Sequence, residues 1–108
     1  MKLLRKRICW DGEKLTIEIL NLSDSVIVFL YDSKRGLGTL AFALPRSEEE
    51  PSRSAIFIGG KYRLLSRIIA ERLAFRYRKP VLALIRLKLP ENESMRRIAG
   101  LLKSLPEL

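Results

Sequence analysis

Few residues of this sequence could carry catalytic chemistry. The chain has no His, so the commonest general base and metal ligand is missing, and catalytic triads that depend on His are excluded. Cys9 is the only cysteine, which rules out a disulfide within the chain. Because it stands beside Trp10 in an expected strand, we expect a buried structural thiol rather than a nucleophile. The residue types therefore indicate a protein that is not an enzyme.

Two short motifs could hold a ligand. Glu48-Glu49-Glu50 could bind a hard cation, but consecutive carboxylates in a polar loop are usually a solvated charge run. Ile58-Gly59-Gly60-Lys61 joins an expected strand to a helix, and helix N-termini attract anions. The full P-loop pattern is absent, and paired glycines mostly mark tight backbone geometry. We expect no metal and no cofactor; a nucleotide-using enzyme is the weakest hypothesis and predicts thermal stabilisation by nucleotides.

The charge of the chain raises the odds of an anionic partner. Lys and Arg number 21 against 12 Asp and Glu, a formal charge of +9. The partner could be a nucleic acid, an acidic protein surface or a phospholipid face. A basic surface that is merely solvated would give the same charge. The longest apolar run, Val26 to Tyr31, is too short to cross a bilayer, and a cytoplasmic protein is expected. The absence of Gln and the presence of only two Asn suggest a thermophilic source, which a mesophilic melting temperature would contradict.

The pattern of apolar residues predicts one α+β domain over residues 1–108. The first four strands should form an antiparallel meander, because Asp11-Gly12 is a strong hairpin signal and further turn residues follow. The expected strands are Leu3–Trp10, Lys14–Leu22, Ser25–Tyr31, Leu37–Leu44, Ala55–Ile58 and Val81–Leu87. Helices are expected over Lys61–Tyr77, ended by Pro80, and over Met95–Ser104.

The first helix has two distinct sides. At about 100° per residue, Leu65, Ile69 and Leu73 form one stripe that should face the sheet. A different side carries Arg63 and Arg67, with Phe75 alongside. Arg and aromatic side chains are favoured at interfaces, so these three are the candidate partner-binding residues. An ordinary solvated helix face would show the same pattern.

Several strands are apolar on both faces, which indicates a sheet covered on both sides. Two helices can cover one face of a six-stranded sheet. We therefore predict a mostly antiparallel six-stranded sheet with both helices on one face and the other face packed in a dimer. A split of the helices across both faces is the alternative. The predicted dimer face consists of Ile27, Phe29, Leu40, Phe42, Leu82 and Leu84.

The order of these elements resembles the third and fourth proteasome assembly chaperones, the fourth more closely, and suggests an archaeal homologue. The resemblance covers most of the chain from about Thr16 onward. It is carried by Leu22-Ser23-Asp24-Ser25-Val26-Ile27-Val28, Leu37-Gly38-Thr39-Leu40-Ala41-Phe42-Ala43-Leu44, Ile69-Ala70-Glu71-Arg72-Leu73-Ala74 and Lys79-Pro80-Val81-Leu82-Ala83.

The resemblance implies a non-enzymatic dimer that binds proteasome α subunits and helps them assemble into a ring. The second copy could be the same chain or a paralogue. The main alternative is a basic nucleic-acid-binding protein, supported by the charge and the basic helix. Steep salt dependence of binding to DNA or RNA would favour that alternative.

Overall fold

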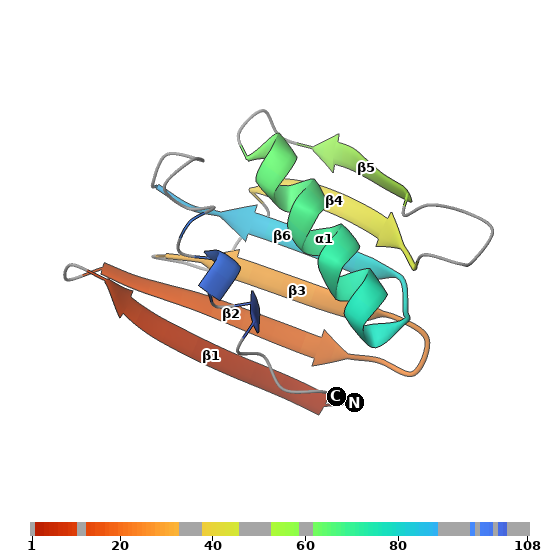
Figure 1. The fold of residues 1–108 in the computed structure, drawn as a ribbon, viewed down its shortest axis with the longest axis horizontal. Coiled ribbons are helices and arrows are strands. Elements are labelled where there is room, and N and C mark those ends of the chain that lie inside the picture. The colour runs from red at the N-terminus through yellow and green to blue at the C-terminus, as the bar shows by residue number, and fades with distance from the viewer. Residues whose placement is uncertain are drawn as a thin grey trace.

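The computed structural model describes residues 2–10, 13–32, 38–45, 53–58, 62–88, 96, 98–100 and 102–103. These residues form an α+β fold in which a mixed, mostly antiparallel sheet carries a long helix on one face (Figure 1), as predicted. In chain order the elements are β1 (Lys2–Trp10), β2 (Glu13–Asn21), β3 (Val26–Tyr31), β4 (Thr39–Leu44), β5 (Arg53–Ile58), α1 (Arg63–Tyr77) and β6 (Val81–Arg86).

The order of strands across the sheet corrects one prediction. The order is β1-β2-β3-β6-β4-β5, so the expected meander is wrong after β3. Strand β6 lies between β3 and β4, parallel to the first and antiparallel to the second. The physical reason is hydrophobicity: these three strands are apolar on both faces and take adjacent interior positions. The strand with most cations, β1, lies at one edge.

Hydrogen bonds at both ends hold β6 beside β3. At the first end, the Val26 N–H donates to the Pro80 carbonyl at 2.9 Å. Close by, the Lys79 ammonium donates to Asn21 Oδ1 at 2.8 Å and to the Leu22 carbonyl at 2.9 Å. At the other end, the Lys88 N–H donates to Asp32 Oδ2 at 2.6 Å. These bonds join residues that are far apart in the chain. They fix the parallel pairing of β3 with β6, which sequence patterns did not indicate.

The core lies between α1 and the sheet. Helix α1 packs on β4, β5 and β6, and its predicted sheet-facing stripe of Leu65, Ile69 and Leu73 is buried. Residues 96, 98–100 and 102–103 also have helical backbone and lie on the same side of the sheet (Figure 1). Ile98 and Leu102 join the core there. The rest of the predicted second helix, Met95–Ser104, lies outside the described residues.

Helix α1 begins and ends at residues with a left-handed backbone. Tyr62 has φ 60° and no side chain caps the helix at its N-terminus, but the Tyr62 hydroxyl donates to the Leu87 carbonyl at 3.0 Å. This buried bond anchors the start of α1 to the chain that follows β6. The helix ends at Tyr77, as predicted, and Arg78 follows with φ 55°. Its predicted first residue, Lys61, is outside the described residues.

Gly38 is required where the chain enters β4. Its φ is +52°, a conformation that residues with a Cβ rarely adopt. A Cβ at this position would collide with the carbonyl oxygen of Ile85 on β6. The close approach of the two backbones therefore depends on glycine.

Candidate interaction surfaces

One face of the sheet carries a group of apolar side chains that the core does not use. We call this group the open face; it consists of Ile27, Phe29, Leu40, Phe42, Leu82 and Leu84. Strand register places Leu82 between Ile27 and Phe42, and Leu84 between Phe29 and Leu40. Residues paired in this way point to the same side of a sheet. The six residues predicted for the dimer face therefore form one continuous surface.

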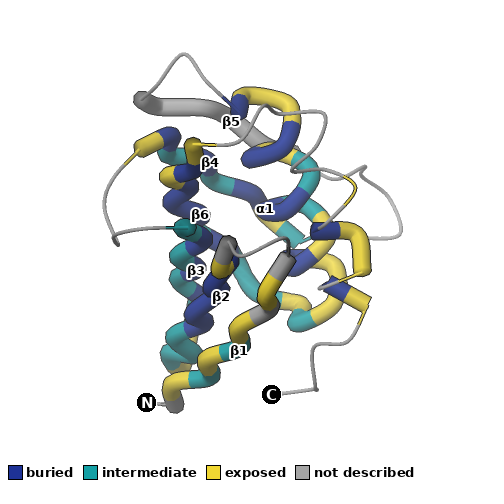
Figure 2. Tube along the Cα trace, turned by 90° about the vertical axis from the view of Figure 1, so that its left-hand side faces the viewer, coloured by how far each residue is buried: buried dark blue, intermediate teal, exposed yellow. Residues whose placement is uncertain are grey.

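Burial alternates along β3 and β4, as expected for a sheet with one covered face, and along β6 except at Leu84. In β3 the buried residues Val26, Val28 and Leu30 belong to the core, and the residues between them are half-buried. Figure 2 shows α1 and the terminal helical residues on one side of the sheet, with no described segment over the other. Leu84 is 7% exposed because apolar neighbours flank it on both strands. Leu44, 41% exposed, extends the open face along β4.

A partly buried ion pair lies at the margin of the open face. Glu18 on β2 is paired in register with Phe29 and is only 1% exposed. Arg5 donates from Nε and Nη2 to Glu18 Oε2, at 3.2 and 2.9 Å, and the Tyr31 hydroxyl donates to Oε1. The carboxylate is thus shielded by an Arg side chain that stays about half-exposed. The apolar surface ends here in a fixed polar cluster.

Cys9 lies farther along β1 and is exposed, so its predicted burial is wrong. The prediction assumed a strand within the sheet, whereas β1 is an edge strand paired on one side only.

The outer side of α1 presents the predicted partner-binding residues to solvent. Arg63, Arg67 and Phe75 are all exposed, Phe75 at 64%. Leu64 is another exposed apolar side chain, at 56%. Phe75 lies well round the helix from the two arginines, because residues 63, 67 and 75 are separated by four and eight positions at about 100° each. The three residues therefore share one helix but do not form one cluster.

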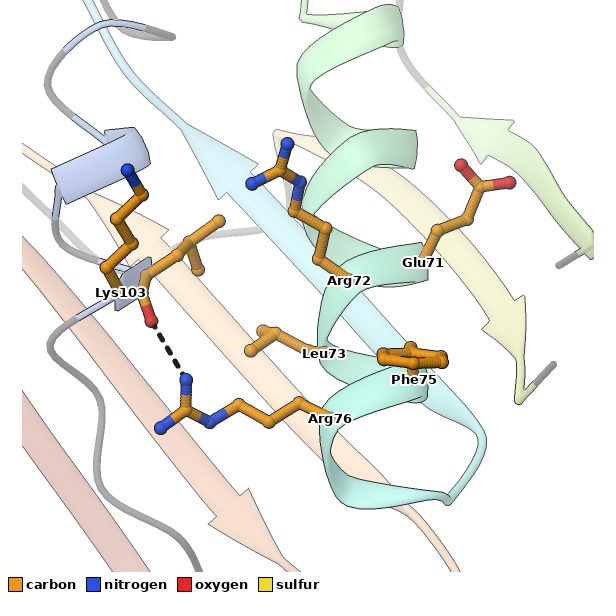
Figure 3. Close-up of a pocket in the computed structure, with 7 residues that line it drawn as sticks. Glu71, Arg72, Leu73, Phe75, Arg76 and Lys103 are labelled. Atoms are coloured by element: carbon orange, nitrogen blue, oxygen red, sulfur yellow. Dashed lines mark hydrogen bonds between the residues drawn. The ribbon is translucent and has the colours of Figure 1, made fainter.

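A groove lies between α1 and the terminal helical residues. We call it the helix groove; its volume is about 560 Å³ and its lining comprises Glu71, Arg72, Leu73, Phe75, Arg76, Leu102 and Lys103. Figure 3 shows Arg72 and Arg76 on the side of α1 that faces Lys103, with Leu73 between them. Glu71 and Phe75 lie farther round the helix in this view, at the outer margin of the groove. A smaller pocket of about 110 Å³ shares Arg72 and Leu102, so the hollow continues along the helix.

Arg76 is held in place at the edge of this groove. Its Nη1 donates to the Leu102 carbonyl at 3.3 Å, and its guanidinium carbon lies 5.9 Å from the centre of the Tyr77 ring. Burial raises the pKa of Tyr77 above its usual value, and the charge of Arg76 and a hydrogen bond from it oppose the shift. The ring therefore stays a neutral surface for the guanidinium at physiological pH.

Sequence patterns located part of these surfaces. They identified Phe75 but not the groove, since Leu102 and Lys103 reach Arg76 only through tertiary packing. The described residues contain no cluster of acidic or Cys side chains suited to a metal ion. Glu48–Glu50 and the Gly59-Gly60-Lys61 junction lie outside the described residues. Within the described part of the chain, no helix is long and apolar enough to span a membrane.

The comparisons with known proteins identify the fold. No protein-family model matches the sequence, and no curated protein does. Among solved structures, a chain of a chaperone complex for yeast 20S proteasome assembly is similar, with a TM-score of 0.69 and 14% sequence identity. The similarity covers 95% of this chain and 95% of that chain. At this identity the similarity shows the fold alone: this chain and that chain of the yeast chaperone complex share one fold.

Proposed function

We propose that this chain is a non-enzymatic, dimeric assembly chaperone that binds proteasome α subunits and promotes assembly of the α ring. The observation that carries the proposal is the shared fold with a chaperone of yeast 20S proteasome assembly, over 95% of both chains. A fold alone can host many functions, so the surfaces must support the role as well. The open face and the outer side of α1 provide that support.

The open face supports the dimer. Five of the six apolar side chains on these three adjacent strands stay partly exposed in a single chain, and Leu84 is nearly buried among them. Large exposed apolar surfaces are avoided in monomers. Packing against the same face of a second copy would remove them from water in a two-sheet sandwich. A homodimer is the simplest form, and a paralogue with a matching apolar face would serve equally.

The outer side of α1 supports a contact with α subunits. Arg63, Arg67 and Phe75 are exposed on the helix, which covers the face of the sheet opposite the open face. A dimer through the open face would therefore leave all three accessible. A charge-assisted contact of this kind forms quickly and suits a partner that is later released.

The experiment is a reconstitution of α-ring assembly from purified α subunits of the same source. We expect substoichiometric amounts of the dimer to increase the rate of ring formation and to be absent from finished rings, both measured by native gel electrophoresis. Unchanged assembly rates at every ratio tested would reject the proposal.

Nucleic-acid binding is a second candidate, because Arg63 and Arg67 on α1 and Arg78 just after it are all exposed, and the chain carries a charge of +9. It predicts that the chain binds a 20-nucleotide RNA. The logarithm of the binding affinity should then fall linearly and steeply with the logarithm of the salt concentration. A shallow slope combined with effects on α-ring assembly would favour the chaperone.

A further inference from the structure

We propose that the helix groove binds an acidic segment of a partner protein, in which one or two bulky apolar side chains are flanked by Asp or Glu. This inference deepens the proposed function, because it names the chemistry that an α-subunit segment would need in order to dock here. It rests on the lining of the groove and not on the similarity to known structures. The two proposals can therefore fail separately.

The groove offers an apolar floor for an anchor side chain. Leu73 and Leu102 lie at its base and are nearly buried, 1% and 7% exposed, whereas Phe75 at its margin is 64% exposed. A volume of about 560 Å³ is sufficient for one or two side chains of the size of Leu or Phe. Covering Phe75 would bury one of the largest apolar surfaces that the helix leaves in water, which is how aromatic anchors contribute to binding.

The charges around the groove determine which partner fits. Its lining contains three cations, Arg72, Arg76 and Lys103, against a single acid, Glu71. A partner segment with carboxylates beside its apolar anchor would place opposite charges next to these three side chains. A second copy that docks through the same groove is a poor occupant, since the three cations of each copy would then face each other. Charge complementarity thus selects an acidic protein segment.

Arg76 is prepared for such a contact. The hydrogen bond to the Leu102 carbonyl and the position over the Tyr77 ring already restrict its guanidinium. An Arg side chain that is ordered before binding loses less conformational entropy when it donates hydrogen bonds to a carboxylate of the partner. Arg76 therefore favours a carboxylate at a defined place beside the apolar floor.

A nucleic acid fits this groove less well. Phosphates recur along a strand and are matched by rows of cations, with bases stacked on aromatic rings. Here the cations surround an apolar floor, and Arg63 and Arg67 do not belong to the lining. Binding of nucleic acid at the groove would overturn the proposal.

The test uses fluorescence anisotropy with a labelled 12-residue peptide that carries two Leu four positions apart and Glu beside each. Matched peptides carry Lys in place of Glu, or Ser in place of Leu. We expect the acidic peptide to bind the dimer at least about tenfold more tightly than either matched peptide. Equal binding of the Lys peptide would contradict the proposal. So would displacement of the acidic peptide by a 20-nucleotide RNA whose own affinity falls in the groove variants.

Variants locate the contact. Phe75→Ser and Arg72→Glu should each weaken acidic-peptide binding by about tenfold, whereas Lys14→Glu, which changes an exposed cation on β2 outside the lining, should change it by less than about twofold. Arg72→Gln is a milder version that removes the charge but keeps a polar side chain, and circular dichroism melting confirms folding of each variant. Equal effects of Lys14→Glu and Arg72→Glu would refute the assignment to the groove. Peptide binding without any effect on α-ring assembly would reject the proposed function and leave the groove assignment intact.

Discussion

The open face and the helix groove lie on opposite sides of the sheet and differ in charge. The six side chains of the open face are all apolar, and its polar neighbour, Glu18, is already neutralised by Arg5. The groove surrounds its apolar floor with Arg72, Arg76 and Lys103. An uncharged surface can meet its own copy without repulsion, whereas a cationic one cannot. We therefore propose self-association for the first surface and an acidic partner for the second.

The largest expected effect comes from placing a charge in the open face. Phe42→Asp would bury an unpaired carboxylate between two apolar faces, so we expect the dimer dissociation constant to rise at least about 100-fold, or about 2.7 kcal/mol. Sedimentation velocity measures it. Leu64→Asp introduces the same charge on the outer side of α1 and should leave the dimer unchanged. If both variants remain dimeric, the open face is not the dimer interface.

Gly38→Ala tests whether the two surfaces share one framework. The added Cβ would meet the Ile85 carbonyl at a positive φ, so the free energy of unfolding should fall by at least about 2 kcal/mol. Guanidinium denaturation measures the loss. Since β4 and β6 support both surfaces, dimerisation and peptide binding should weaken together on heating. A variant as stable as the parent chain would show that Gly38 is not constrained as described.

Phe75→Ser tests whether α-subunit binding can be weakened without changing the dimer. Loss of the exposed ring should reduce capture of α subunits by about tenfold, while the dimer dissociation constant stays within about twofold. Surface plasmon resonance with immobilised α subunits provides the first value and sedimentation the second. A parallel loss of dimerisation would mean that the helix side is not independent of the open face.

The same substitution at one acid of each surface should have unequal effects on stability. Glu18→Gln removes the charge that Arg5 and Tyr31 hold at the margin of the open face, and should cost about 1 kcal/mol of unfolding free energy. Glu71→Gln on the half-exposed helix surface should cost less than about 0.5 kcal/mol. Urea denaturation compares them. A larger loss of unfolding free energy for Glu71→Gln than for Glu18→Gln would show that Glu18 is not the acid that stabilises the fold.

Salt should have the smallest effect and should act on one surface only. Raising NaCl from 0.05 to about 0.5 M should weaken acidic-peptide binding at the groove about three- to tenfold, because screening reduces the attraction of three exposed cations. The dimer dissociation constant should stay constant or fall, since apolar association has no charges to screen. If peptide binding and dimerisation were equally sensitive to salt, the two surfaces would not differ in charge as described.

Sequence patterns predicted the fold class, the open-face residues and the sheet-facing stripe of α1. Those features depend on local periodicity: residues two apart share a strand face, and Leu65, Ile69 and Leu73 share a helix face. The place of β6 could not be predicted in this way. It is fixed by contacts across long sequence separations, such as Lys79 with Asn21 and Lys88 with Asp32.

The two interaction surfaces were predictable to different degrees for the same reason. The open face follows from three strands that are apolar on both sides, whatever their order. The helix groove needs Leu102 and Lys103 beside α1, and nothing in the spacing of residues near 72 and 76 indicates that contact. The exposure of Cys9 was missed because the sequence does not show which strand lies at an edge.

The most direct test of the account is native mass spectrometry of the chain mixed with α subunits of the same source, after nuclease treatment. The account predicts a dimer that carries α subunits and is absent from completed proteasomes. It also predicts that Phe42→Asp abolishes the dimer and that Phe75→Ser keeps the dimer but loses the α subunits. A monomer, or a dimer that binds no α subunit in any assembly state while retaining nucleic acid when nuclease is omitted, would contradict it.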